Sequence, residues 1–355
     1  MIGRLAERFA SWESFLALMA LALLAYAALA VPNFTSAFNL SQAAAGVSEK
    51  ALLALPLTLL IIAREIDLSI ASILALTSVI LGVLVQAGMP LAAAIPIVLL
   101  AGAVAGAFNG LLVTRLDLPS LVVTLGTLAM FRGVGYIILG SASVNVFPDA
   151  LTDLGIDNVP GTQVPWTIVP FLLLAPIFAI VLQHTPTGRR IYALGGNPDA
   201  ARYAGVRSRR VRFALFVVSG LVCALAGIVF TARLANARAN NALGFELDVI
   251  TIALLGGISV FGGRGKLTGV VWALVLVATL RNVLGLLQVG GDAQGIAIGF
   301  LLIGSLLLSN TVEQVLDRAR TRRLVGATLS PRPEAALPGS GLDPGQSSSS
   351  GSKHP

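Results

Sequence analysis

Long apolar stretches alternate with short polar segments along nearly the whole chain. An α-helix needs about 17 to 25 mostly apolar residues to cross the roughly 30 Å hydrocarbon core of a bilayer, where it satisfies its own backbone hydrogen bonds. This pattern predicts an all-α, polytopic membrane protein. Two stretches fit this pattern least well: 43–63, which contains Glu49 and Lys50, and the short stretch 247–261. About ten stretches have a suitable length, and they lie at Ser14–Val31, Ala43–Ala63, Leu68–Gln86, Leu91–Thr114, Leu121–Leu139, Trp166–Gln183, Val211–Arg233, Leu247–Phe261, Thr268–Leu287 and Gln294–Ser309.

The composition places most of the chain in lipid. Of its 355 residues, 56% are hydrophobic and only 12% are charged, and the mean hydropathy is +0.87, a balance too apolar for a soluble protein. The single cysteine, Cys223, excludes an intrachain disulfide and a cysteine-cluster metal site. Because His184 and His354 are the only histidines, we expect neither a metal centre nor a cofactor.

The basic residues lie between the spans and indicate their direction. The formal net charge is +7, but a nucleic-acid binder would carry it as a stripe on a folded surface, so no nucleic-acid partner is expected. Short loops rich in Lys and Arg stay on the cytoplasmic side. The opposite side receives residues 141–165, which include three aspartates and no Lys or Arg. An inward amino terminus then makes both termini cytoplasmic, together with the segments that carry Arg4, Arg8, Arg64, Arg115, Arg189, Arg190, Arg202, Arg207, Arg209, Arg210, Arg212, Arg264, Lys266 and the arginines from Arg318 onward.

The two ends of the chain carry separate signals. Met1–Ala30 resembles a signal peptide, with two arginines before an apolar run and Ala28-Leu29-Ala30 as a candidate cleavage site. We favour an uncleaved span, because the apolar run exceeds the usual signal length of about 7 to 15 residues and cleavage would leave the basic loops with the wrong parity. Residues 1–323 then form the transmembrane domain. The Pro-, Gly- and Ser-rich residues 324–355 are expected to be a disordered cytoplasmic tail.

Small residues inside the spans indicate close helix packing. Gly102, Gly106 and Gly110 recur every four residues, the spacing that lets two membrane helices approach closely. Gly220, Ala224 and Gly227 in the seventh span, and Gly295 with Gly299 in the tenth, repeat this pattern of small residues. We expect these helices to be buried in a bundle.

Polar residues inside the spans are candidates for a transport path, since a polar group facing lipid is costly and normally points into a bundle or a watery cavity. A sugar would need such hydrogen-bonding groups on leaving water. Alternatively, Arg132 and Arg281 reach an interface or pair with a carboxylate such as Asp292. Asn109 could instead make a helix–helix hydrogen bond. The candidates are Asn109, Thr124, Arg132, Arg281 and Asn282.

No segment of the sequence is suited to hydrolysing ATP or to other catalysis. Residues 262–267 invite comparison with a phosphate-binding loop, but Val260 replaces the first glycine of that motif and Leu267 replaces its final hydroxyl residue. No Ser/His/Asp arrangement or set of metal ligands is evident. We therefore expect no enzymatic activity. Asp67, at the start of the third span, is interpreted as a helix cap.

The basic segment 185–212 has the features of a short helix between glycine-containing turns. Asn197 can cap this helix, Pro198 suits its first position, and Asp199 complements its dipole. Ala200 favours helix, and Gly205 can close it. A cytosolic partner could bind such a short helix. The density of arginine alone equally predicts an amphipathic connector held by anionic lipid headgroups.

Several motifs occur in an order that resembles the permease subunits of ribose-type sugar importers of the ATP-binding-cassette class. The similarity covers about Phe34 to Ser309, and rhamnose-type permeases resemble the chain most, followed by autoinducer-2 permeases. One departure is Arg64-Glu65, where the family usually has glycine; we expect a local Arg/Glu pair to replace the flexibility of that turn. The motifs are Ile66-Asp67-Leu68-Ser69, residues 118–127 followed by Phe131-Arg132-Gly133, residues 188–206, residues 244–248 and residues 255–263.

The resemblance implies one subunit of a larger transporter in the bacterial cytoplasmic membrane. A second permease subunit, either a copy or a paralogue, would lie beside it above two cytosolic ATP-binding subunits. An extracytoplasmic binding protein would deliver the sugar. ATP binding would convert an outward opening to an inward one. The resemblance further implies that the cytosolic subunits act on Gly195, Gly196, Asn197, Pro198, Asp199, Ala200 and Gly205.

Two other functions are compatible with such a composition. A self-sufficient secondary transporter would need a buried carboxylate or an unwound helix to bind a coupling ion. Asp67, Glu246 and Asp248 lie near predicted span ends, and no acidic residue stands out at the middle of a span. A membrane scaffold without transport would explain the packing glycines but not the short helix in the basic segment.

Overall fold

A computed structural model describes residues 12–291, 293–301 and 303–304. These residues form helices joined by loops, and they contain isolated β-bridges but no strand. The predicted tail, 324–355, lies outside the described residues. The helices are α2 (Trp12–Ala30), α3 (Ala37–Ile62), α4 (Ile70–Gln86), α5 (Leu91–Arg115), α6 (Ser120–Leu139), α7 (Asp149–Ile156), the 3₁₀ helix η1 (Trp166–Ile168), α8 (Val169–His184), α9 (Pro186–Gly196), α10 (Pro198–Tyr203), α11 (Ser208–Leu234), α12 (Phe245–Leu255) and α13 (Leu267–Leu286).

The described part of the chain contains 7 helices long and apolar enough to cross a membrane, and α4 is a shorter apolar helix. This part of the molecule is therefore a multi-pass, all-helical membrane protein. The predicted eighth span is shorter than expected, because α12 has 11 residues and is about 16 Å long at 1.5 Å per residue. The tenth predicted span, 294–309, extends past the described residues, of which 293–301 and 303–304 are helical.

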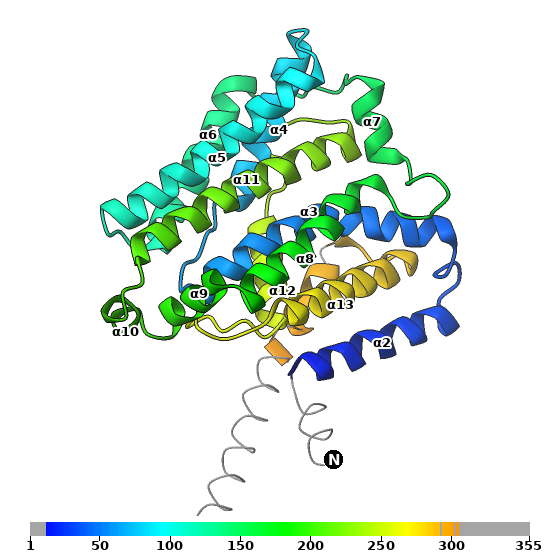
Figure 1. Cartoon of the computed structure of the whole chain (residues 1–355). Helices are drawn as coiled ribbons and strands as arrows, with labels where there is room; N and C mark the ends of the chain where they lie inside the picture. The colour runs from blue at the N-terminus through cyan, green and yellow to red at the C-terminus, as the bar shows by residue number, and fades with distance from the viewer. Residues whose placement is uncertain (1–11, 292, 302, 305–355) are drawn as a thin grey trace, which may run out of the picture. The chain divides into compact units, whose positions relative to one another are not determined.

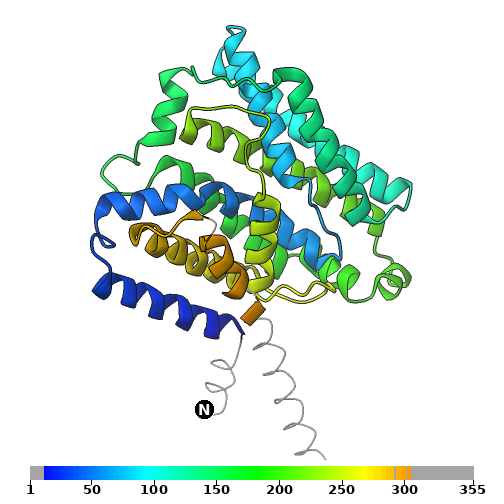
Figure 2. The same cartoon turned by 180° about the vertical axis from the view of Figure 1, so that it is seen from behind.

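The helices of residues 12–291 pack in two groups that meet where α11 crosses α3. In one group α4 and α5 pack on α11, and α6 packs on α4; in the other, α8, α12 and α13 pack on α3, and α2 packs on α13. Figure 1 shows α5 beside α11 and α2 beside α13, and Figure 2 shows the same pairs from behind. The core includes buried apolar side chains of α3, α4, α11, α12 and α13.

The predicted glycine contacts hold α5 against α11. A Cβ atom added to Gly106 would lie 2.2 Å from the carbonyl oxygen of Phe216, and one added to Gly220 would lie 2.1 Å from that of Gly102. Both distances are far below a van der Waals contact, so a side chain at either position would force the helices apart. Gly295 and Gly299 differ, because a Cβ atom on either would meet nothing within 4 Å.

The loops that the positive-inside rule placed on one side do meet one another. Arg209 pairs with Asp117 at 2.6 Å, and the Tyr192 hydroxyl donates a hydrogen bond to the carbonyl oxygen of Gly265. On the other side, Val144 forms an isolated β-bridge with Ala237. The first and last of these contacts place the starts of α6 and α11 near each other and their ends near each other.

Arg64-Glu65 differs from the expected local ion pair. Glu65 is buried and pairs with Arg212 of α11 at 3.2 Å. Arg64 has a φ of 70°, a left-handed conformation that favours glycine. The family's usual glycine therefore suits the backbone here, and the Arg64–Glu65 pair that we predicted is wrong.

Candidate functional site

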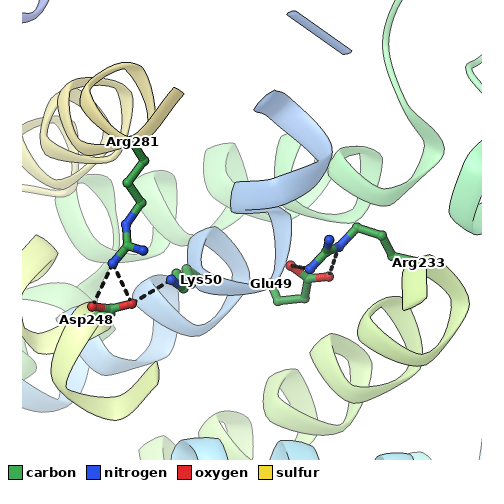
Figure 3. Close-up of polar contacts among 5 residues, drawn as sticks. All are labelled: Glu49, Lys50, Arg233, Asp248 and Arg281. Atoms are coloured by element: carbon green, nitrogen blue, oxygen red, sulfur yellow. Dashed lines mark hydrogen bonds and ion pairs between the residues drawn. The ribbon is translucent and has the colours of Figure 1, made fainter. Parts of the chain in front are cut away.

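The middle of α3 carries two charged residues inside the apolar helix group. Glu49 is completely buried and Lys50 is 9% exposed. Arg233, in the last turn of α11, binds the Glu49 carboxylate with its Nε at 2.7 Å and its Nη2 at 3.5 Å (Figure 3). This pair connects the two helix groups through α3 and α11.

Lys50 leaves α3 on a different side from Glu49 and binds a carboxylate of α12. Its Nζ lies 2.6 Å from Oδ2 of Asp248, and Nη2 of Arg281 on α13 lies 2.9 and 3.0 Å from the two oxygens of the same carboxylate (Figure 3). The Lys50 ammonium also stands 4.5 Å from the ring centre of Phe245, a favourable cation–π contact. One carboxylate thus joins three helices.

Five side chains form the charge cluster: Glu49, Lys50, Arg233, Asp248 and Arg281. Burial of a charge is costly unless it is paired and hydrogen-bonded, so these side chains fix the relative positions of the helices that carry them. Three cations face two carboxylates, and the side chains of Asp248 and Arg281 remain 29% and 33% exposed. Charges at such a position in a membrane protein normally face water or another protein surface, and not lipid.

Arg132 of α6 holds the loop that precedes α12. Its Nη1 donates hydrogen bonds to the carbonyl oxygens of Ala239, at 2.8 Å, and Asn241. The Asn241 side chain in turn donates to the backbone of Asn236. Arg132 therefore fixes the 235–244 loop, a role that sequence reasoning did not identify.

Asn109 and Thr124, two of the predicted path residues, are fully buried in supporting contacts. Asn109 donates to the Ser69 hydroxyl at 2.8 Å, which confirms the expected helix–helix hydrogen bond. Ser69 donates its backbone N–H and its hydroxyl to Asp67, at 3.0 and 2.6 Å. Thr124 donates to the carbonyl oxygen of Ile66 at 3.1 Å. The two residues therefore brace the α3–α4 turn, and their place on a transport path stays a prediction.

Asn282 and Arg281 point to different partners. The side-chain amides of Asn282 and Asn39 exchange two hydrogen bonds of 2.9 Å, which join α13 to the start of α3. Arg281 does pair with a carboxylate, but its partner is Asp248. The suggested partner, Asp292, lies outside the described residues.

The predicted short helix of the basic segment is present as α10. Oδ1 of Asn197 accepts hydrogen bonds from the backbone N–H groups of Asp199 and Ala200, at 3.1 and 3.0 Å, and Pro198 occupies the first position. Gly205 has a φ of +81° and follows the last turn as the predicted helix terminator. These features confirm the local geometry; the action of a partner there stays a prediction.

A basic recess of about 800 Å³ lies between α10, the start of α11 and the α3–α4 turn. Two of its arginines are ion-paired: Arg209 with Asp117 and Arg212 with Glu65. Within the described residues no group of three or more His, Cys, Asp or Glu side chains could hold a metal ion. The recess is lined by Ala63, Arg64, Glu65, Asp117, Leu194, Pro198, Asp199, Arg202, Val206, Arg207, Ser208, Arg209, Arg210 and Arg212.

The charge cluster is the feature that sequence reasoning missed. Glu49 and Lys50 are charges within an apolar stretch of the sequence. We interpreted them as evidence against a membrane span there, and not as residues with partners on other helices. Glu49 also contradicts the expectation that no acidic residue stands at the middle of a span, since it lies at the centre of α3. Its bidentate contact with Arg233 accounts for this position structurally.

Comparison with known proteins places the chain among membrane permeases. Residues 39–306 match the family model described as "Branched-chain amino acid transport system / permease component". The ribose import permease protein RbsC of Haemophilus influenzae is 32% identical over 305 residues, which cover 84% of this chain and 92% of that protein. The L-arabinose transport system permease protein AraH of Escherichia coli K12 is 33% identical over 298 residues, covering 83% and 90%.

A third relative is the autoinducer 2 import system permease protein LsrC of Escherichia coli K12 / DH10B. It is 33% identical over 291 residues, which cover 82% of this chain and 84% of that protein. No solved structure matches the chain. Because the family model covers most of the sequence and the relatives align along most of their own lengths, this chain belongs to the branched-chain amino acid transport system permease-component family.

Proposed function

We propose that this chain is the membrane-spanning permease subunit of an ATP-binding-cassette importer for a monosaccharide, with a rhamnose-like sugar favoured. The observation that carries the proposal is the near full-length match to permeases named for ribose, L-arabinose and autoinducer 2 import. The family description names branched-chain amino acids. The relatives' names favour a polyhydroxylated solute over an amino acid. Among sugars, a rhamnose-like one is favoured because the sequence resembles rhamnose-type permeases most.

The proposal includes partners that the chain does not supply itself. Two cytosolic ATP-binding subunits would provide the energy, because the sequence lacks a phosphate-binding loop. A second permease subunit, a copy or a paralogue, would complete the gate in the bacterial inner membrane. An extracytoplasmic binding protein would deliver the sugar at the face that holds the acidic segment 141–165. Both termini and α9–α10 would then be cytoplasmic, following the positive-inside rule.

Within this proposal the path and the coupling element have different residues. Arg132 and Arg281, with partly exposed side chains, supply donors beside the path, and Asn282 extends it through its pair with Asn39. Asn109 and Thr124 support the adjoining turn. The cytosolic subunits would dock on α10 and the basic recess, where Pro198 and Asp199 lie at the surface. A displacement of α10 would then change the relative positions of the helices.

Uptake by proteoliposomes tests this function and separates it from its two rivals. The chain is reconstituted with its copurifying cytosolic subunits and binding protein, and accumulation of radiolabelled rhamnose, ribose and arabinose is measured. Uptake that requires ATP and every partner is the expected result. Accumulation driven by an ion gradient in the chain alone would establish a secondary transporter, whereas no uptake under any condition would favour a scaffold. Uptake of leucine in preference to every sugar would overturn the substrate assignment.

A further inference from the structure

The end of α3, the end of α9 and the turn between α12 and α13 meet backbone to backbone, with no side chain between them. The N–H group of Gly263, in the turn between α12 and α13, donates a 2.8 Å hydrogen bond to the carbonyl oxygen of Ile62, the last residue of α3. Gly195, near the end of α9, covers this bond. A Cβ atom on Gly195 would lie 1.7 Å from the Ile62 oxygen and 2.4 Å from the Gly263 nitrogen. Only glycine fits here without moving one of the three segments.

The turn is equally constrained on its own side. Gly263 has a φ of +70°, and a Cβ atom there would lie 2.7 Å from the nitrogen and the Cα atom of Gly196. The Tyr192 hydroxyl of α9 donates a 2.7 Å hydrogen bond to the carbonyl oxygen of Gly265. Burial, with a smaller effect from the Glu13 carboxylate, raises the pKa of this phenol, so it stays protonated as a donor. α9 is thus attached to the turn by direct contact and by a hydrogen bond.

The elements joined at this contact are joined again by the charge cluster. Lys50 of α3, Asp248 of α12 and Arg281 of α13 share one ion-paired group, about 18 Å from Ile62 along α3 at 1.5 Å per residue. α3, α12 and α13 are therefore connected at two levels. A movement imposed at one level is transmitted to the other, because packed helices move as nearly rigid bodies.

The far end of the basic segment leads to the other helix group. α10 continues through Gly205 into α11, and α11 is linked back to the α3 side by the Arg212–Glu65 and Arg233–Glu49 ion pairs. The segment therefore has one end seated on α3 and the α12–α13 turn and the other end covalently continuous with α11. Its displacement would change the position of one group against the other.

We infer that Gly195, Ile62 and Gly263 form a transmission contact, through which movement of α9–α10 reaches α3 and α12 and, at their other level, the charge cluster. Gly195 and Gly263 are positioning residues in this inference, and they act by letting backbone meet backbone. A side chain between them would separate α9 from the helices that it drives. The inference rests on the proposed function and adds to it the route of coupling.

Replacement of Gly195 by alanine tests the contact, with Gly126→Ala in α6 as the control, because a Cβ atom on Gly126 would meet nothing within 4 Å. The reconstituted complex is assayed for subunit assembly, basal ATP hydrolysis and sugar taken up per ATP hydrolysed. We expect Gly195→Ala to assemble and hydrolyse ATP while uptake per ATP falls about tenfold, within the usual range for coupling between sites. Gly126→Ala should match the wild type in all three readouts.

Wild-type uptake per ATP in Gly195→Ala would overturn the inference. If that variant does not assemble, Tyr192→Phe decides, because it removes only the hydrogen bond to Gly265. A lowered uptake-to-ATP ratio in assembled Tyr192→Phe supports the contact, and an unchanged ratio overturns it. Absence of ATP-dependent uptake in the wild-type complex would count against the proposed function instead, since the transmission contact concerns only the efficiency of coupling.

Discussion

At the scale of residues, the Glu49–Arg233 pair shows how an apolar helix can carry a charge. Glu49 has no exposed surface, whereas 23% of the Arg233 side chain remains exposed. In such surroundings the attraction between the charges offsets their desolvation only while both partners are present. A buried pair therefore contributes little compared with well-packed apolar residues, yet removal of one partner leaves an uncompensated charge. This asymmetry leads to a prediction for variants of the pair.

Arg233→Met, which leaves the Glu49 carboxylate buried without its partner, should lower the free energy of unfolding by about 3 to 5 kcal/mol. The double variant Glu49→Leu/Arg233→Met should recover much of this loss, because no unpaired charge remains. Thermal unfolding in detergent micelles of the wild type, both single variants and the double variant gives the coupling free energy. Strictly additive losses would contradict a direct energetic interaction between the two side chains.

Arg64 provides a second test, because its left-handed backbone conformation costs a residue with a Cβ atom about 1 to 2 kcal/mol relative to the right-handed one. Arg64→Gly should therefore raise the unfolding temperature, even though it removes a side chain. Arg190→Gly is the control, since Arg190 lies inside α9, where glycine costs about 1 kcal/mol. The two substitutions remove the same side chain and should shift the unfolding temperature in opposite directions. A decrease for both would contradict backbone strain at Arg64.

The residues of the site differ in how far sequence predicts them. The cap formed by Asn197 was predictable, because donor and acceptor lie within three residues of each other and local geometry fixes their contact. The partner of Arg281 was not, since Asp248 lies on another helix. Apolar periodicity gives the length of a helix, but in a membrane it leaves the facing direction of each polar residue open. Pairs between helices therefore required the structure.

At the scale of elements, the membrane helices were predictable from length and hydropathy, and the differences arise at turns. α12 ends at Leu255 because Gly257 adopts a φ of +83° and the N–H of Ile258 returns to the carbonyl oxygen of Ala253, a glycine-dependent helix terminator. α3 begins earlier than predicted because the Ser36 hydroxyl caps the N–H of Asn39. Capping chemistry thus overrode the boundary drawn from apolar residues alone.

At the scale of the described molecule, the positive-inside rule and the contacts between loops agree on which segments share a side. The segments that contain Asp117, Gly265 and Arg212 lie within reach of α9–α11, and residues 144 and 237 meet at the opposite side. Contacts establish the grouping but not which group faces the cytosol. The excess of arginine in the first group supplies that direction, and a labelling experiment tests it.

Two exposed positions report the sides separately, because Val146 is 83% exposed and Tyr203 is 92% exposed. The native thiol at Cys223 is buried, so Cys223→Ala gives a background without cysteine. In intact spheroplasts, a membrane-impermeant maleimide should label Val146→Cys, while Tyr203→Cys should react only after permeabilisation, since the membrane then no longer shields the cytoplasmic loops. The opposite labelling pattern would invert the orientation and place α10 beyond the reach of any cytosolic subunit. Labelling of both positions from outside would mean that α8 and its neighbours do not separate the two groups of loops, and the grouping by charge would lose its physical basis.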